Sequence, residues 1–221
     1  MKKITVLVLL SIIGLSGGSP RLAAADLAQL IKDSQRTVSE DGKVILVWWI
    51  TEQFWAESFK KQPNLSDEQR AQFAAVMKPY TVFCVAALDV GPLGGLTARD
   101  RESVARNIQL TVGTSKLSPL TDTEISADAK NFYDMMKPML AGMLGQVGKG
   151  MEFFVYSNKV PGDALNPTKK GGFTYEAFGY TFKWRLPLGS LLPARIDQSS
   201  GEEFPGDYDF NPYTGKKLSS R

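Results

Sequence analysis

Two runs of apolar residues place the strongest constraint on how this chain can fold. Val44–Ile50 and Val82–Leu88 consist entirely of apolar residues, with β-branched and aromatic side chains among them and no polar alternation. Successive side chains of a strand point to opposite faces of its sheet, so a strand without polar residues must be covered on both faces. The sequence therefore predicts a central sheet that lies between two other layers.

Helix signals fill the segment between these two predicted strands. A first helix is expected from Glu52, with Thr51 as its cap. Ser66 and Gln69 have the spacing of a capping box, which predicts a second helix that ends near Pro79. The order strand, helix, helix, strand suggests a crossover unit, right-handed if the two strands are parallel neighbours.

The second half of the chain predicts one long helix and several antiparallel strands. Apolar residues at helical spacing indicate a helix that begins after Ser126, with a kink at Pro138. Residues 153–156 read as a strand, and 173–178 followed by the alternating 180–186 read as a hairpin. We expect an α+β fold: a mixed sheet with an N-terminal strand-helix-helix-strand unit, a long Met-rich helix and a C-terminal antiparallel hairpin.

The first 25 residues have the pattern of a secretory signal peptide. Lys2 and Lys3 precede the apolar residues 4–15, and Ala23–Ala25 offers a cleavage site after Ala25. The apolar stretch is shorter than the roughly twenty residues that cross a bilayer, so no stable transmembrane anchor is expected after cleavage. We expect a periplasmic or secreted protein. The predicted divisions are the signal peptide 1–25, an exported α+β domain 26–192 and a polar tail 193–221.

Charge and composition exclude several classes of function. The whole chain has 26 basic and 23 acidic side chains, and removal of the signal with Lys2, Lys3 and Arg21 leaves equal numbers of each. Nucleic-acid binding is therefore not expected. The chain has no histidine and a single cysteine, Cys84, which rules out a Ser-His-Asp triad, a Cys-His pair, a structural zinc site and an internal disulfide. We expect Cys84 to be buried, and no cofactor.

Two carboxylates are candidates for acid–base chemistry. Glu52 follows the first apolar strand and Asp89 follows the second, so parallel strands would bring both to one edge of the sheet. One alternative function is therefore a carboxylate-dependent hydrolase that uses Glu52 and Asp89. The structural interpretation, an early-helix acid and a turn residue, is favoured, so an enzyme is the less expected outcome.

The methionines of the long helix suggest a second candidate site. Met135, Met136, Met139, Leu140 and Met143 share the apolar stripe of this helix. Methionine packs in cores and also lines adaptable binding grooves, so the stripe is either core or a groove for a protein partner or an apolar ligand. A further alternative is Cu(I) handling by Met135, Met136, Met139 and Met143 through their soft thioethers.

The tail resembles a zinc ribbon that has lost its cysteines. Asp197-x-x-Ser200-Gly201 and Asn211-Pro212-x-Thr214-Gly215 have the spacing of the two metal-binding turns of such a module. The four ligand positions hold Asp197, Ser200, Asn211 and Thr214, so every thiolate is missing. The resemblance implies that the turns persist without the metal.

Residues 44–192 resemble a group of uncharacterised exported bacterial proteins. The resemblance rests on Val47–Ile50 with Phe54-Trp55, Met136–Leu140, Phe153–Val155 and Trp184–Pro193. It implies export and transfers no catalytic residue. The sequence as a whole favours a non-catalytic protein of the cell envelope that binds a protein partner or an apolar ligand.

Overall fold

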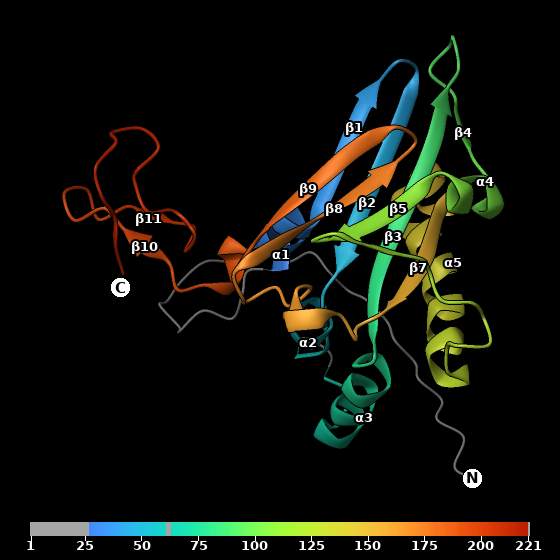
Figure 1. Ribbon diagram of the computed structural model, residues 1–221, viewed down its shortest axis with the longest axis horizontal. Coiled ribbons are helices and arrows are strands. Elements are labelled where there is room, and N and C mark those ends of the chain that lie inside the picture. Colours follow the sequence, from blue (N-terminus) through green and yellow to red (C-terminus); the bar gives the residue numbers. More distant parts are fainter. Residues whose placement is uncertain (1–26, 61–62, 221) are drawn as a thin grey trace.

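The expected α+β class is confirmed by the computed structural model, which describes residues 27–60 and 63–220 (Figure 1). The main sheet has five strands. They are β1 Gln35–Glu40, β2 Lys43–Ile50, β3 Tyr80–Val90, β4 Leu96–Ala98 and β7 Met151–Ser157. β3 is the central strand, because it pairs with β2 along one edge and with β7 and β4 along the other.

The two apolar runs form β2 and β3, but their relative direction differs from the crossover expected from sequence. The expected mixed sheet is also corrected, because the strands described in the main sheet all pair antiparallel. The strands are direct antiparallel neighbours, with Lys43 opposite Asp89 and Ile50 opposite Val82. The two helices between them, α2 Glu52–Lys60 and α3 Asp67–Met77, pack against each other. A pair of helices carries the chain away from the sheet and back to the same end, whereas a parallel crossover must deliver it to the opposite end.

A second sheet covers one face of the main sheet (Figure 1). Its strands are β5 Ile108–Val112, β6 Ser115–Leu117, β8 Gly171–Ala177 and β9 Tyr180–Leu186. Aromatic rings join the two sheets: Trp49 meets Phe173 edge to face with centroids 4.9 Å apart, and Phe83 stacks on Tyr175 at 4.5 Å. The predicted hairpin is confirmed as β8 and β9, and its two-residue turn is Phe178-Gly179, both with positive φ.

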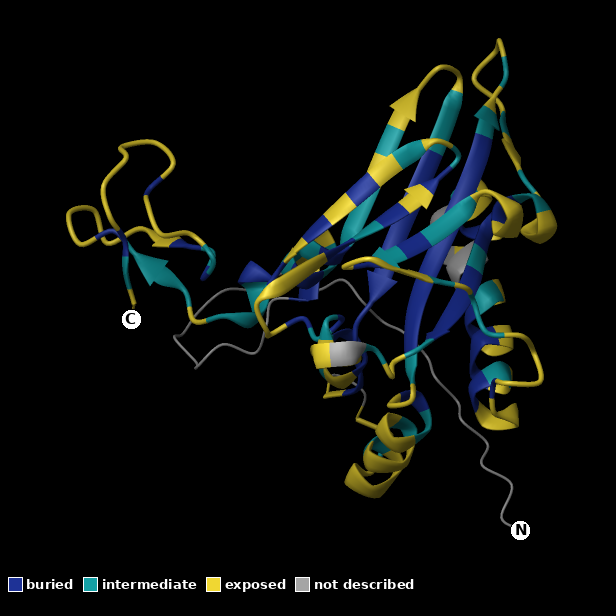
Figure 2. Cartoon of the chain, in the orientation of Figure 1, coloured by how far each residue is buried: buried dark blue, intermediate teal, exposed yellow. Residues whose placement is uncertain are grey.

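Helices cover the opposite face. Besides α2 and α3, the chain forms α1 Leu27–Ser34, α4 Arg101–Arg106 and α5 Ala127–Lys149. Trp48, the neighbour of Trp49 on β2, meets Phe54 of α2 at 4.9 Å, and Phe153 of β7 stacks on Tyr133 of α5 at 5.4 Å. The main sheet is therefore covered on both faces, as the unbroken apolar runs predict, and its central strands are buried along most of their length (Figure 2).

The long helix begins where the sequence indicates, but its break lies elsewhere. Ser126 caps α5 by accepting a hydrogen bond from the Ala129 N–H group. The backbone leaves helical geometry at Gly145, which has φ 58° and ψ −130°, and the expected kink at Pro138 is not the point of departure. A positive φ is accessible to glycine without steric cost, so Gly145 absorbs the change of direction.

The tail forms a small sheet of its own beside the domain (Figure 1). Its strands are β10 Arg195–Ile196, β11 Glu203–Phe204 and β12 Ser219–Ser220. The 3-10 turns η1 Pro161–Asp163 and η2 Gly189–Leu191 precede it, and the Gly206 N–H group donates to the Gly189 carbonyl oxygen of η2 at 3.3 Å. The signal segment and its cleavage site after Ala25 lie outside the described residues. Within the described ranges, no helix has the length and apolarity needed to cross a membrane.

Candidate functional site

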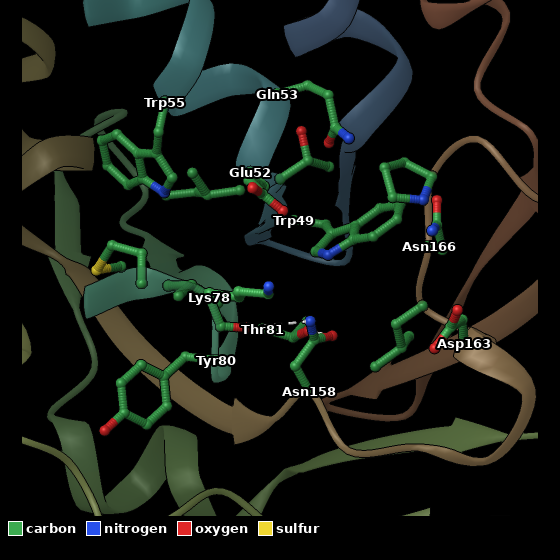
Figure 3. A pocket seen from close by; sticks show the side chains of 16 residues that line it. Trp49, Glu52, Gln53, Trp55, Lys78, Tyr80, Thr81, Asn158, Asp163 and Asn166 are labelled. Carbon is green, nitrogen blue, oxygen red and sulfur yellow. Dashed lines mark hydrogen bonds between the residues drawn. The ribbon is translucent and has the colours of Figure 1, made fainter. Parts of the chain in front are cut away.

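A polar pocket opens at the edge of the main sheet where β2 ends and β3 begins. The antiparallel pairing of β3 with both β2 and β7 brings the end of β2, the start of β3 and the end of β7 together there. The loop 163–167 closes one side, and the pocket has a volume of about 180 Å³. Four segments that are far apart in the sequence thus converge on one small cavity, which we call the polar pocket (Figure 3).

Two opposite charges face the polar pocket without pairing. The Glu52 carboxylate, from the first turn of α2, and the Lys78 ammonium, just before β3, both point into the cavity in Figure 3. In the described part of the chain, neither side chain forms a salt bridge. Asp163, on the far side of the cavity, pairs with Lys169 at 2.6 Å. Glu52 and Lys78 are both exposed, so water solvates their charges, and a ligand that carried two opposite charges could replace that water.

Amide and hydroxyl groups also line the polar pocket. The Thr81 hydroxyl donates to Asn158 Oδ1 at 2.9 Å, and Asn158 Nδ2 donates to the Lys78 carbonyl oxygen at 3.3 Å, so the Asn158 amide is held in one orientation. Gln53 Oε1 is buried and has no hydrogen-bond partner among the described residues. A buried acceptor without a partner costs free energy, which a donor from a ligand or a water would recover.

An indole ring forms the rigid floor of the pocket. Trp49 lies between Glu52 and Asn158 in Figure 3 and is almost fully buried. It is fixed from behind by Phe83, stacked at 6.4 Å, and by Phe173, edge to face at 4.9 Å. A ring held by the core of both sheets is a rigid part of the pocket lining.

An apolar groove lies on the helical side, between α3 and α5. It has a volume of about 280 Å³ and is lined by the apolar side chains Phe59, Leu65, Phe73, Val76, Phe132 and Met135. Met135 is 37% exposed, as expected for a residue at the rim of a groove, whereas Met136 is 8% exposed and packs in the core. The side chains of Met139, Leu140 and Met143 lie outside the described residues.

The divergence of Met135 and Met136 means that these two thioethers cannot both bind the copper ion predicted as an alternative, and the other two methionines, Met139 and Met143, have side chains outside the described residues. Adjacent residues on a helix point about 100° apart, so one thioether lines the apolar groove while the other faces the core. A single ion could not be held by both without disrupting the core. Among the described residues, no group of three or more His, Cys, Asp or Glu side chains could hold a metal ion.

The carboxylate pair expected from sequence is not formed. Asp89 lies opposite Lys43 at one end of β2, and Glu52 follows Ile50 at the other end. Seven steps of a strand, at about 3.4 Å each, separate the two ends by about 24 Å. Asp89 instead binds Arg99 at 2.8 Å. The prediction was wrong because it assumed parallel strands, so the Glu52–Asp89 hydrolase is not supported.

The single cysteine has a structural role. Cys84 is fully buried, as expected, and burial raises the pKa of its thiol.

Sequence reasoning missed Lys78, Gln53 and Asn158, whose only signal is that polar residues stand close to the ends of apolar strands. Comparisons of the chain with protein-family models, with curated proteins and with solved structures found no match.

Proposed function

We propose that this is an exported, non-catalytic binding protein that holds a small zwitterionic solute of the amino-acid type in the polar pocket. The observation that carries the proposal is the presence of Glu52 and Lys78 in one cavity, unpaired with each other or with another described residue. A molecule with an ammonium and a carboxylate group would satisfy both charges at once, and charge-assisted hydrogen bonds are the strongest that proteins form.

The rest of the lining fits the same ligand. The side chains of Gln53, Thr81 and Asn158 add polar groups to the lining beside the two charges. A volume of about 180 Å³ admits only a small molecule.

The hydrogen bonding of the pocket favours binding over reaction. A hydroxyl becomes a nucleophile when it donates to a base, but the Thr81 hydroxyl donates to the amide oxygen of Asn158, which does not take up its proton at neutral pH.

The test is calorimetric titration of the mature protein with a panel of free amino acids. For each one that binds, the N-acetylated form and the C-terminal amide remove one charge at a time. We expect Glu52→Gln and Lys78→Met each to weaken binding by about ten- to a hundred-fold, because a hydrogen bond to a charged group contributes about 1.5–3 kcal/mol. Glu68→Gln, an exposed acid on α3 outside the pocket, is the matched control and should bind as the natural protein does. Equal affinity for the charged and capped ligands, or no binding by the folded protein across the panel, would refute the proposal.

A second candidate function, binding of an apolar ligand, is favoured by the apolar groove and by the exposure of Met135 at its rim. The probe is 1-decanol, which is apolar and uncharged, measured by titration calorimetry. Met135→Arg should abolish binding because it places a charge in the groove, whereas Asp134→Arg, exposed beside it and outside the groove lining, should not. Unchanged binding in Met135→Arg would remove the groove from consideration.

A further inference from the structure

Two turns of the tail repeat the same backbone hydrogen bonds. In the first turn, residues 197–202, the Asp197 N–H group donates to the carbonyl oxygen of residue 202 at 3.0 Å. In the second turn, residues 211–216, the Asn211 N–H group donates to the carbonyl oxygen of residue 216 at 2.7 Å. Gly201 donates back to Asp197 at 2.7 Å, and Gly215 donates back to Asn211 at 2.8 Å. Each pair of equivalent residues is separated by the same sequence offset, so the turns are structural copies.

The first side chain of each turn also plays the same role. Asp197 Oδ1 accepts the N–H group of Ser199 at 2.8 Å, two residues further on, and Asn211 Oδ1 accepts that of Tyr213, also at 2.8 Å. Asn211 Oδ1 accepts the next N–H group as well, at 3.2 Å. Each oxygen therefore accepts hydrogen bonds from backbone N–H groups of its own turn, which stabilise an acceptor with negative charge or high electron density.

The fourth and fifth residues of the turns match too. Ser200 Oγ accepts a hydrogen bond from the N–H group of residue 202 at 3.3 Å, and Thr214 Oγ1 accepts one from the N–H group of residue 216 at 3.4 Å. Gly201 and Gly215 follow with φ of 74° and 69°, a conformation that other residues rarely adopt. Positions 197, 200, 211 and 214 are thus the four equivalent acceptor positions of the paired turns, and they are the positions where a zinc ribbon has its cysteines.

A direct hydrogen bond joins the two turns. Asn211 Nδ2 donates to Asp197 Oδ2 at 2.6 Å, and both residues are 3% exposed. Hydrogen bonds from the Ser199 hydroxyl and N–H group, and then from Asn211, lower the pKa of the Asp197 carboxyl to about 2. The carboxylate is therefore ionised at neutral pH and fully engaged within the tail.

The side chains at these positions do not fit a metal ion. Zinc prefers thiolate or imidazole ligands, whereas this set has two neutral hydroxyls, an amide and one carboxylate. Calcium needs six to eight oxygen ligands, and both Asp197 oxygens already accept hydrogen bonds from the chain.

We propose that residues 195–220 are a metal-free counterpart of a zinc ribbon, in which the Asp197–Asn211 hydrogen bond joins the two turns in place of a metal ion. The replacement has a chemical advantage in an exported protein. Exposed thiolates oxidise in that environment and lose their metal, whereas a carboxylate and an amide are inert to oxidation.

The test uses the full mature chain and has two parts. In the natural protein, native mass spectrometry should find no metal bound, and the tail amide signals in NMR spectra should be unchanged by EDTA. In the variant Asp197→Cys/Ser200→Cys/Asn211→Cys/Thr214→Cys, four thiolates should bind one Co²⁺ ion with the absorption spectrum of a tetrahedral thiolate site, and Zn²⁺ should displace it. The control places each of four cysteines one residue away, as Gln198→Cys/Ser199→Cys/Pro212→Cys/Tyr213→Cys, and should give no such spectrum.

Three outcomes would overturn the proposal. The first is a stoichiometric metal in the natural protein, and the second is loss of the tail signals in EDTA. The third is the absence of a tetrahedral Co²⁺ spectrum in the four-cysteine variant. This outcome counts whether the tail is folded or stays unfolded in excess metal, because either result means that the four positions do not converge. A single variant, Asn211→Leu, should abolish the tail's protected amides and leave those of the α+β domain unchanged.

Discussion

Phe83 provides the sharpest test of the contact between the two sheets. Its ring is fully buried and meets the rings of Trp49, Phe173, Tyr175 and Trp184 at centroid distances of 6.4, 5.7, 4.5 and 6.1 Å. Truncation of a buried phenylalanine to alanine costs about 3–5 kcal/mol, and each aromatic pair contributes about 0.5–1.5 kcal/mol beyond its buried area. With rings from both sheets around it, we expect Phe83→Ala to lower the free energy of unfolding by about 5 kcal/mol.

Phe83→Leu separates the two contributions, because it keeps most of the volume and loses the ring contacts. We expect a loss of about 1–2 kcal/mol for this variant. The assay is urea unfolding followed by tryptophan fluorescence, with an unchanged m value as the sign that the same transition is observed. Phe210→Ala, whose side chain is 57% exposed on the tail, is the control and should change stability by less than about 0.5 kcal/mol. A loss below about 2 kcal/mol for Phe83→Ala would refute the packing of the two sheets on this ring.

Three further predictions follow from single residues. Gly172→Ala should destabilise the protein by about 1–3 kcal/mol in urea unfolding, because its Cβ atom would stand 2.7 Å from the Trp184 carbonyl oxygen. Gly171→Ala is the control: its Cβ atom would have its nearest contact at 3.9 Å, so stability should be unchanged or slightly higher. Equal losses of stability in the two variants would contradict the prediction. The lowered pKa of Asp197 means that its contribution to tail stability is complete above the unfolded pKa of 3.8 and is lost as the pH falls toward about 2. The NMR signals of the tail should follow this titration, and signals that stay unchanged down to pH 2 would contradict the prediction. Burial raises the pKa of the Cys84 thiol, so it should react with a disulfide-exchange reagent only after unfolding, and rapid reaction of the native protein would show the strand to be open.

The layers of the fold follow from the sequence because burial leaves a periodic signature. An unbroken apolar strand such as Val44–Ile50 has no side that can face water, and the structure covers both of its faces. The alternation in 180–186 likewise predicts a strand with one exposed face, which is what β9 has. In contrast, β1 is mostly polar and was not predicted as a strand, because its place in the sheet is set by pairing with β2 rather than by its own composition.

The candidate site was predictable only in part because strand direction has no such signature. A strand has the same apolar pattern whichever way it runs, so the pattern could not show whether Asp89 or Lys78 would lie near Glu52. The antiparallel pairing of β2 and β3 decided this in favour of Lys78, which stands before β3 rather than after it. Asn158, just after β7, and the loop 163–167 join Glu52 in the pocket lining through contacts across more than a hundred residues, which a local pattern does not encode.

The central position of β3 also determines the order in which the sheet can be completed during synthesis. β2 is available to pair with β3 as soon as residue 90 has been made, but the other edge of β3 needs β7, which ends at residue 157. Until then the nascent chain presents an apolar strand edge, the kind of edge that pairs with other chains. Closing a loop of this length is slow. The newly made chain therefore stays incompletely folded for most of its synthesis, a state in which it can be bound by chaperones or threaded through a narrow channel.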